Sequence, residues 1–180
     1  MGEFHGDDQV LVVLENGEFC TTTSDATNHY DPNILRIEKF DPDKVWTVAL
    51  YDAAQGYPYL KRFVFEAGSR KQSFLGDNPD SRLLLITDTA YPRIEVAFGE
   101  GDSFREPMVV DAAEFIAVKG FKAKGKRLTN YSVATINELE PLRQEDDSVV
   151  EDDSSVETDT LMDSNVDKPE DSASGQMTLF

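Results

Sequence analysis

Cysteine and histidine are scarce in this sequence, and long apolar runs are missing. Cys20 is the one cysteine, so the chain can form no internal disulfide and no thiolate metal site. The histidines, His5 and His29, have no histidine or cysteine partner at the spacing of a metal site. No apolar run approaches the roughly 18 residues of a membrane helix, and the segment from Met1 to Asp8 is too polar for a signal peptide. These absences predict a reduced compartment, the cytoplasm, with no metal site and no membrane segment.

The usual motifs of catalytic and nucleotide-binding sites are also missing. There is no Gly-x-Ser-x-Gly elbow, no Walker loop, no dinucleotide fingerprint and no calcium-binding loop. The 35 acidic residues show no pair whose spacing singles it out for acid–base catalysis. We therefore expect no catalysis by this chain itself. A carbohydrate-active propeller enzyme is an alternative, and it would require a pocket with two facing carboxylates.

Positive charge is scarce too, and negative charge concentrates at one end. The chain has 17 lysines and arginines against 35 aspartates and glutamates, for a net charge of −18. Residues 144–180 contain twelve of these acids and one base, Lys168, and residues 144–175 have no aromatic residue. Such a composition cannot bury enough apolar surface to fold. We therefore predict a folded domain over residues 4–142 and a disordered acidic tail over residues 143–180.

Four segments predict β-hairpins, because two apolar runs flank a short polar turn in each. The dipeptide Asn16-Gly17 is the strongest signal, since both central residues of its turn require positive φ. The predicted hairpins span residues 10–23, 45–65, 83–98 and 114–136. The repeats begin near Asp8, Val45, Ser81 and Glu114, about 33–37 residues apart. Shorter strand-like pieces lie between them, at residues 34–40, 70–74 and 108–110.

The repeat predicts an all-β, propeller-like fold. Each unit would be an antiparallel sheet of three or four strands, and radial repetition leaves only short exposed edges. A plain β-sandwich is the competing architecture. The helix candidates are short, at residues 111–114 and 137–139. Most aromatic residues alternate along strands and are expected in the core, while Tyr57, Tyr59 and Phe121 stay open as base-stacking residues.

Residues 119–127, here called the basic loop, have a high density of cationic side chains and no acidic residue. Their sequence KGFKAKGKR contains five bases in nine residues: Lys119, Lys122, Lys124, Lys126 and Arg127. Glycines let the backbone approach a polyanion closely, and the cations neutralise phosphates. The loop therefore predicts contact with nucleic acid. A solvated hairpin tip, or a partner for the acidic tail, is the alternative interpretation.

Two further basic pairs are weaker candidates for DNA contact. They are Lys61-Arg62 and Arg70-Lys71, each at or near the edge of a predicted strand. Alone, each pair is typical of ordinary surface charge. They would contribute to a DNA site only if the fold brings them to the same rim as the basic loop.

The last five residues, QMTLF, return to apolar side chains after a long polar stretch. They resemble the Gln-x-x-Leu-Phe motif by which bacterial proteins dock on the replication sliding clamp. In that motif Leu179 and Phe180 would fill an apolar pocket, and Gln176 would fix the register. The alternative is an apolar end that packs on its own domain or does nothing.

Several of these segments together resemble the C-terminal domain of the A subunit of bacterial type IIA topoisomerases, DNA gyrase and topoisomerase IV. The resemblance rests on residues 114–129, which include the basic loop, and on residues 10–23, 56–63 and 83–98. It covers about residues 4–142 and is greatest for topoisomerase IV-like A subunits of the Bacteroidetes type.

This resemblance implies a β-pinwheel, a propeller-like disc of four-stranded blades that exchange strands, with about three blades in this chain. It implies a basic rim that binds and bends duplex DNA independently of sequence and presents it to the cleavage core. The partners implied are duplex DNA, the rest of the A subunit and the B subunit, in a cytoplasmic, nucleoid-associated protein. ATP and Mg²⁺ belong to other domains of the parent enzyme, so no cofactor is expected in this chain.

The departures from the family pattern favour one of its two members. Gyrase has a Gln-Arg-Arg-Gly-Gly-Arg-Gly box for tight DNA wrapping, and the nearest counterpart here, residues 121–127, has neither the glutamine nor the paired glycines. We therefore expect DNA bending of the topoisomerase IV type. The alternative function is a protein-interaction propeller scaffold whose tail docks on a replication partner. A continuous positive rim would favour DNA, whereas scattered bases beside an exposed apolar patch would favour a protein partner.

Overall fold

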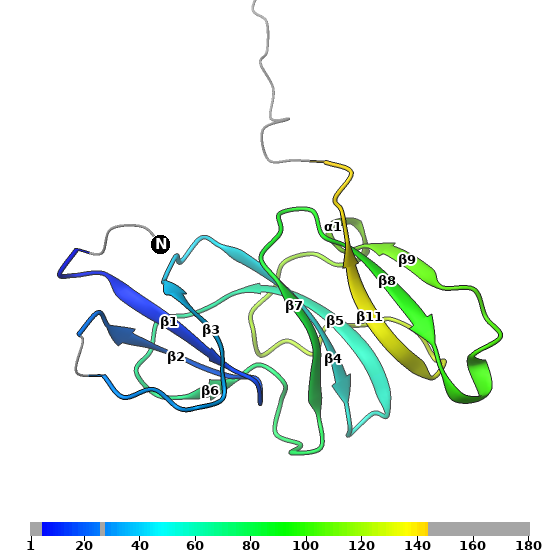
Figure 1. Ribbon diagram of the computed structural model, residues 1–180, viewed down its shortest axis with the longest axis horizontal. Coiled ribbons are helices and arrows are strands. Elements are labelled where there is room, and N and C mark those ends of the chain that lie inside the picture. Colours follow the sequence, from blue (N-terminus) through cyan, green and yellow to red (C-terminus); the bar gives the residue numbers. More distant parts are fainter. Residues whose placement is uncertain (1–4, 26–27, 144–180) are drawn as a thin grey trace, which may run out of the picture. The chain divides into compact units, whose positions relative to one another are not determined.

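Three antiparallel sheets form the described part of the chain (Figure 1). The computed structural model describes residues 5–25 and 28–143. Their only helices are η1 (Glu100–Asp102), a 3-10 turn, and α1 (Ala112–Phe115), neither of which could span a membrane. The predicted all-β fold with about three blades is confirmed. The tail and its terminal motif (Gln176, Leu179 and Phe180) lie outside the described residues and stay predictions.

Sheet A is built on the hairpin that the Asn16-Gly17 turn predicts. Its strands, in spatial order, are β3 (Ile34–Lys39), β1 (Gln9–Leu14), β2 (Glu18–Thr23) and β6 (Gln72–Ser73). Gly17 has a φ of 78°, in the left-handed region that such a turn requires. A Cβ at this position would lie 2.2 Å from Cγ of Leu75, because the residues after β6 pack directly on the turn.

Sheet B is the middle layer. Its strands, in spatial order, are β10 (Lys126–Arg127), β5 (Tyr57–Val64), β4 (Val45–Asp52) and β7 (Arg82–Thr87). Strands β4 and β5 form the second predicted hairpin, paired from Val45↔Val64 to Asp52↔Tyr57. Five consecutive residues of β4, 46–50, are buried. The run is continuous because this sheet is covered on both faces, where an exposed sheet would alternate.

Sheet C has three strands within the described residues. They are, in spatial order, β11 (Val133–Leu139), β8 (Arg93–Phe98) and β9 (Met108–Asp111). Ile94, Val96 and Ile136 face sheet B and are buried, while the residues between them are more exposed. This alternation is typical of a sheet with one face on the core and the other toward water.

The third and fourth predicted hairpins are wrong. Strands β7 and β8 do flank residues 88–92, but they lie in different sheets, so this turn carries the chain from one blade to the next. The fourth hairpin would have started at residues 114–119, where α1 ends and no strand follows until β10. The helix candidate at residues 111–114 is confirmed as α1, whereas residues 137–139 belong to β11.

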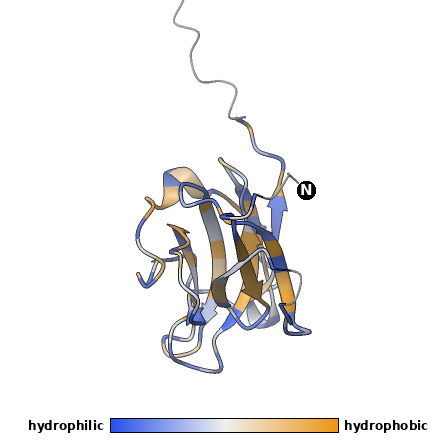
Figure 2. Ribbon diagram, turned by 90° about the vertical axis from the view of Figure 1, so that its left-hand side faces the viewer, coloured by the Kyte–Doolittle hydropathy of each residue, from blue (hydrophilic) through white to orange (hydrophobic). Residues whose placement is uncertain are grey.

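Two layers of apolar side chains hold the three sheets together. Figure 2 colours the ribbon by hydropathy and shows hydrophobic residues along the strands. The layer between sheets A and B is rich in aromatic residues, and Phe19, Trp46 and Phe63 are at most 1% exposed there. The ring centres of Phe19 and Phe65 lie 4.6 Å apart. The layer between sheets B and C is aliphatic and includes Leu60. Aromatic residues predicted in the core are thus found there, and this packing excludes much apolar surface from water.

Neighbouring sheets exchange strands. Strand β6 follows β5 of sheet B in sequence, yet it pairs with β2 of sheet A through Glu18↔Ser73 and Phe19↔Gln72. Strand β10 follows β9 of sheet C in sequence, yet it pairs with β5 of sheet B through Leu60↔Lys126. Sheets A and B therefore each borrow one outer strand from the next repeat, as the pinwheel resemblance implies.

Candidate nucleic-acid interface

The basic loop, residues 119–127, begins shortly after α1 and ends with β10, and it contacts the edge of β5. The backbone N–H of Lys119 donates to the carbonyl oxygen of Arg62 at 2.8 Å. A tight turn follows, in which the N–H of Ala123 donates to the Gly120 carbonyl oxygen at 2.9 Å. The end of the loop forms β10, which pairs with β5. Just after β10, the N–H of Leu128 donates to the carbonyl oxygen of Pro58 at 2.9 Å. Strand β5 therefore fixes both ends of the loop.

Gly125 allows the loop to lie this close to β5. Its φ is 86°, a conformation that residues with a side chain rarely adopt. A Cβ at this position would lie 2.4 Å from the carbonyl oxygen of Leu60 and 2.6 Å from Cγ of Lys61. The glycine is therefore required by both backbone conformation and space.

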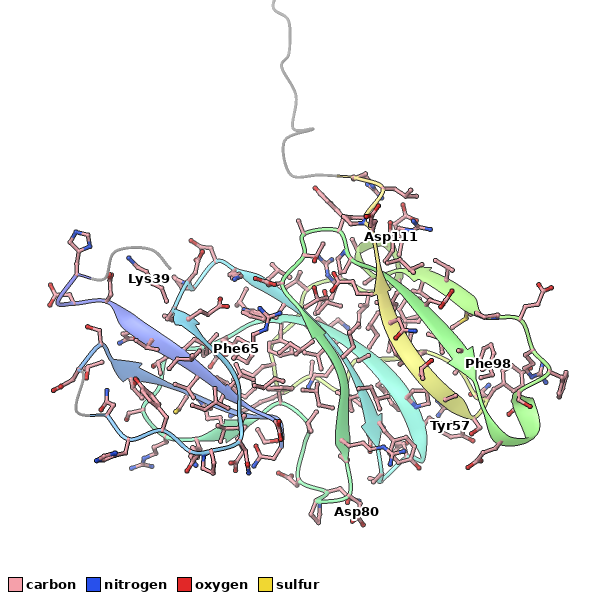
Figure 3. The ribbon with its side chains drawn as sticks, viewed as in Figure 1. Lys39, Tyr57, Phe65, Asp80, Phe98 and Asp111 are labelled. Atoms are coloured by element: carbon pink, nitrogen blue, oxygen red, sulfur yellow. The ribbon has the colours of Figure 1, made fainter. Side chains whose placement is uncertain are left out.

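Phe121 anchors the loop to the core instead of facing a nucleic acid. Its side chain is 1% exposed, and its ring centre lies 5.0 Å from that of Phe19 in an edge-to-face arrangement. Tyr59 is also buried, at 5% exposed. Tyr57, at the start of β5, is half-buried and lies at the surface beside Arg127 (Figure 3). Of the three aromatic residues left open by the sequence, only Tyr57 has surface for a ligand.

The buried side chain of Lys61 connects the basic loop to the segment that follows β6 by hydrogen bonds. Its side chain is 6% exposed, and Nζ donates to the carbonyl oxygens of Phe74 at 2.7 Å and Phe121 at 2.5 Å. Burial lowers the pKa of Lys61 from the ordinary 10.5 to about 8, so the amine is still protonated at neutral pH. Lys61 thus supports the loop and is not available for a phosphate.

The five cations of the basic loop itself point to solvent. The exposed members are Lys119, Lys122, Lys124, Lys126 and Arg127. Nζ of Lys126 lies 4.3 Å from the ring centre of Phe115, and the guanidinium carbon of Arg127 lies 4.1 Å from that of Tyr57. Cation–π contacts of this kind orient the side chains while leaving the charges accessible.

None of these five cations forms an ion pair with an acidic residue among residues 5–25 and 28–143. Other surface cations do, as in the pairs Lys39–Asp8, Lys44–Asp88, Lys71–Asp31, Arg105–Asp102 and Arg143–Glu114. Like charges that lack counter-charges repel one another, so a polyanion lying across the loop would lower the electrostatic free energy. The arrangement favours binding of phosphates.

The other three weaker candidates for DNA contact, Arg62, Arg70 and Lys71, differ in exposure and in hydrogen bonding. Arg62 is half-buried, donates to the carbonyl oxygen of Ala90 at 3.3 Å and has its pKa lowered by burial. Arg70 is exposed, and Lys71 is exposed but bonds Asp31. Arg70 and Lys71 directly precede β6, so they lead into one exchanged strand just as the basic loop leads into the other. Both exchanged segments are therefore basic.

The alternation of residues along β5 is a sequence signal for the burial of Lys61. Lys61 alternates along β5 with Tyr59 and Phe63, and residues two apart on a strand share a face. Both neighbours belong to the core between sheets A and B. The same alternation places Arg62 on the other face, so the two members of this basic pair have different environments.

A cavity of about 1310 Å³ between sheets A and B bears on the carbohydrate-active alternative. Glu38 and Asp88 line it, and both bond the ammonium of Lys44, at 2.6 and 2.5 Å. Burial by itself would raise the pKa of Asp88, but the hydrogen bond and charge of Lys44 outweigh burial and lower it. The acid of a glycoside hydrolase has a raised pKa, so Asp88 does not fit that role.

Comparison with known proteins agrees with the resemblance noted in the sequence. The family model described as "Topoisomerase C-terminal domain, Bacteroidota" matches residues 1–140. These residues include all three sheets and the basic loop. No curated protein and no solved structure matches the chain. The match covers most of the chain, which therefore belongs to the Bacteroidota family of topoisomerase C-terminal domains.

Proposed function

We propose that this domain binds and bends duplex DNA through its phosphate backbone, independently of sequence, as the accessory module of a topoisomerase A subunit. The exposed cations of the basic loop, which form no ion pair within the described part of the chain, carry this proposal. Contacts from such cations to phosphates fix the position of a duplex and read no bases. The primary contacts are Lys119, Lys122, Lys124, Lys126 and Arg127, and the secondary contacts are Arg62, Arg70 and Lys71. Lys61 is left out because its amine is buried.

The remaining parts of the proposal rest on membership of the family. The domain acts with the rest of the A subunit and with the B subunit, where ATP and Mg²⁺ are used. Residues 121–127 lack the gyrase-type box, which favours bending of the topoisomerase IV type over tight wrapping. Docking on the replication sliding clamp through Gln176, Leu179 and Phe180 is a separate proposal, tested by deleting residues 176–180 and measuring clamp binding.

The direct test is a salt titration of binding to a non-specific DNA duplex. Each phosphate contact releases counterions and contributes about 0.9 to the slope of log K against log salt concentration. The triple variant Lys122→Ala, Lys124→Ala, Lys126→Ala should therefore bind more weakly at every salt concentration. Its slope should be shallower by about 2–3.

A matched variant separates specific contact from net charge. Lys39→Ala, Arg105→Ala and Arg143→Ala together remove the same charge from cations that are already paired with Asp8, Asp102 and Glu114. We expect this variant to keep the wild-type slope. Equal losses in both triple variants would show that only overall charge matters, and no binding of the wild type at low salt would exclude the proposal.

Removal of the acidic tail should strengthen DNA binding. Residues 144–180 hold twelve acidic residues and one lysine, so the tail competes with DNA for the same cations. A chain ending at Leu142 is expected to bind the duplex more tightly than the full chain, with the largest difference at low salt. Unchanged affinity at low salt would show that the tail does not occupy the basic loop.

A further inference from the structure

The exchanged strands follow one rule in the first two sheets. In sheet A the second strand of the hairpin, β2, is flanked by β6 from the next repeat. In sheet B the second strand of the hairpin, β5, is flanked by β10, again from the next repeat. The corresponding strand of sheet C is β9, and among the described residues it pairs only with β8. Within residues 5–25 and 28–143, no strand fills beside β9 the position that β6 and β10 fill in the other sheets.

The backbone of β9 presents hydrogen-bonding groups at this open edge. Ala112 N–H donates to the carbonyl oxygen of Pro92 at 3.0 Å, so residue 112 points toward β8. Because alternate residues of an antiparallel strand bond to opposite sides, Val110 also points toward β8. The N–H and C=O groups of Val109 and the N–H of Asp111 therefore point away from β8, as a strand partner would require. The C=O of Asp111 is used by α1, because Asp111 is the N-cap of that helix.

The side chains around this edge indicate what kind of strand fits it. Val109 is 49% exposed, and Phe104 in the loop before β9 is 77% exposed. Glu106 is exposed two residues before the strand, and Glu95 lies directly across from Val109 on β8. Glu114, just after the strand, is already paired with Arg143 and is not part of this set. Apolar and acidic side chains thus flank the edge, and they favour a partner strand with apolar and cationic residues.

We propose that β9 is a docking edge for an extended, cationic segment of another polypeptide, which adds to sheet C as a fourth strand. Two observations carry this proposal: the edge that the exchange rule leaves open, and the acidic, partly apolar side chains beside it. Backbone hydrogen bonds would supply affinity and the alternating side chains would supply specificity, as in other cases of strand addition. The proposal is independent of DNA binding.

The test uses the full chain and a fluorescent synthetic peptide with the sequence of residues 121–131, which contains a strand that fills the equivalent position on β5. The Val109→Pro variant removes the outward N–H without touching the bonds to β8, and edge strands tolerate proline at such positions. We expect Val109→Pro to weaken peptide binding about tenfold or more. Val109→Thr, which keeps the N–H, should bind like the wild type.

Two controls keep the result interpretable. A peptide N-methylated at alternate residues has the same charge but lacks the N–H groups that bond to a strand, and it should not bind. The acidic tail is present in every chain compared, so its attraction for a cationic peptide is the same in each measurement. Hydrogen exchange of the Val109 and Asp111 amides in the wild type should slow when the peptide binds, which tests the edge even if the proline variant folds poorly. Equal binding of both peptides, absence of binding, or no added protection would each overturn the proposal. So would self-association of the free chain that Val109→Pro abolishes, since a second copy would then fill the edge.

Discussion

Replacing Phe121 with alanine is expected to lower the free energy of unfolding by about 3–5 kcal/mol, the range for truncating a buried phenylalanine. Phe121 is 1% exposed and packs edge-to-face on Phe19, although it lies in the middle of an otherwise polar loop. Its loss would leave a cavity between sheets A and B and free the basic loop from the core. Urea unfolding followed by the fluorescence of Trp46, which is 1% exposed, measures the effect.

The matched control is Phe104→Ala, because Phe104 is 77% exposed. That substitution should change stability by no more than about 0.5 kcal/mol, as surface substitutions usually do. If Phe121 stacked on a base, the alanine variant would instead bind DNA more weakly and keep the stability of the wild type. That pattern in the alanine variant would mean that the ring faces the nucleic acid and not the core.

Replacing Lys61 with methionine is expected to destabilise the domain by about 2–4 kcal/mol at pH 7. The buried carbonyl oxygens of Phe74 and Phe121 both lose their donor, and an unsatisfied buried polar group costs about 1–3 kcal/mol. Methionine preserves the length and the apolar part of the side chain, so the effect reports on the amine. The variant should also bind DNA more weakly, because one of the contacts that hold the basic loop is lost.

The same residue predicts a pH dependence. The pKa of Lys61 is about 8 in the folded domain and near the ordinary 10.5 in the unfolded chain, so between these values the unfolded chain binds more protons. Stability therefore rises with pH in this window and falls again as pH drops toward 8. We expect the stability difference between wild type and Lys61→Met to grow from pH 8 to pH 10.

Exposed Lys119 provides the control for this pH dependence. Its replacement by methionine should leave the pH profile of unfolding unchanged, since the Lys119 side chain stays in contact with solvent when the chain folds. A stability difference between wild type and Lys61→Met that does not vary between pH 8 and pH 10 would contradict burial of the Lys61 amine.

Much of the candidate site could be predicted because its signals are local. The charge density of residues 119–127 is visible in the sequence, and the structure places all five of its cations at the surface. The burial of Phe121 was not visible, because a single aromatic residue among lysines has no periodic pattern around it. Lys61 was misjudged as a surface residue by its charge, although its alternation with Tyr59 and Phe63 indicated the core face.

The sequence by itself determined the all-β class, the first two hairpins, the basic loop and a short helix, predicted at residues 111–114 and found at Ala112–Phe115. Each depends on neighbours in sequence: alternation of apolar residues, the Asn16-Gly17 turn, the Asp111 cap and a run of lysines. Only the tertiary structure decided which strands pair. A turn such as residues 88–92 reverses the chain, but it does not specify whether β7 and β8 join the same sheet. That choice, and with it the exchange of β6 and β10, depends on side chains that meet only after the three sheets pack together.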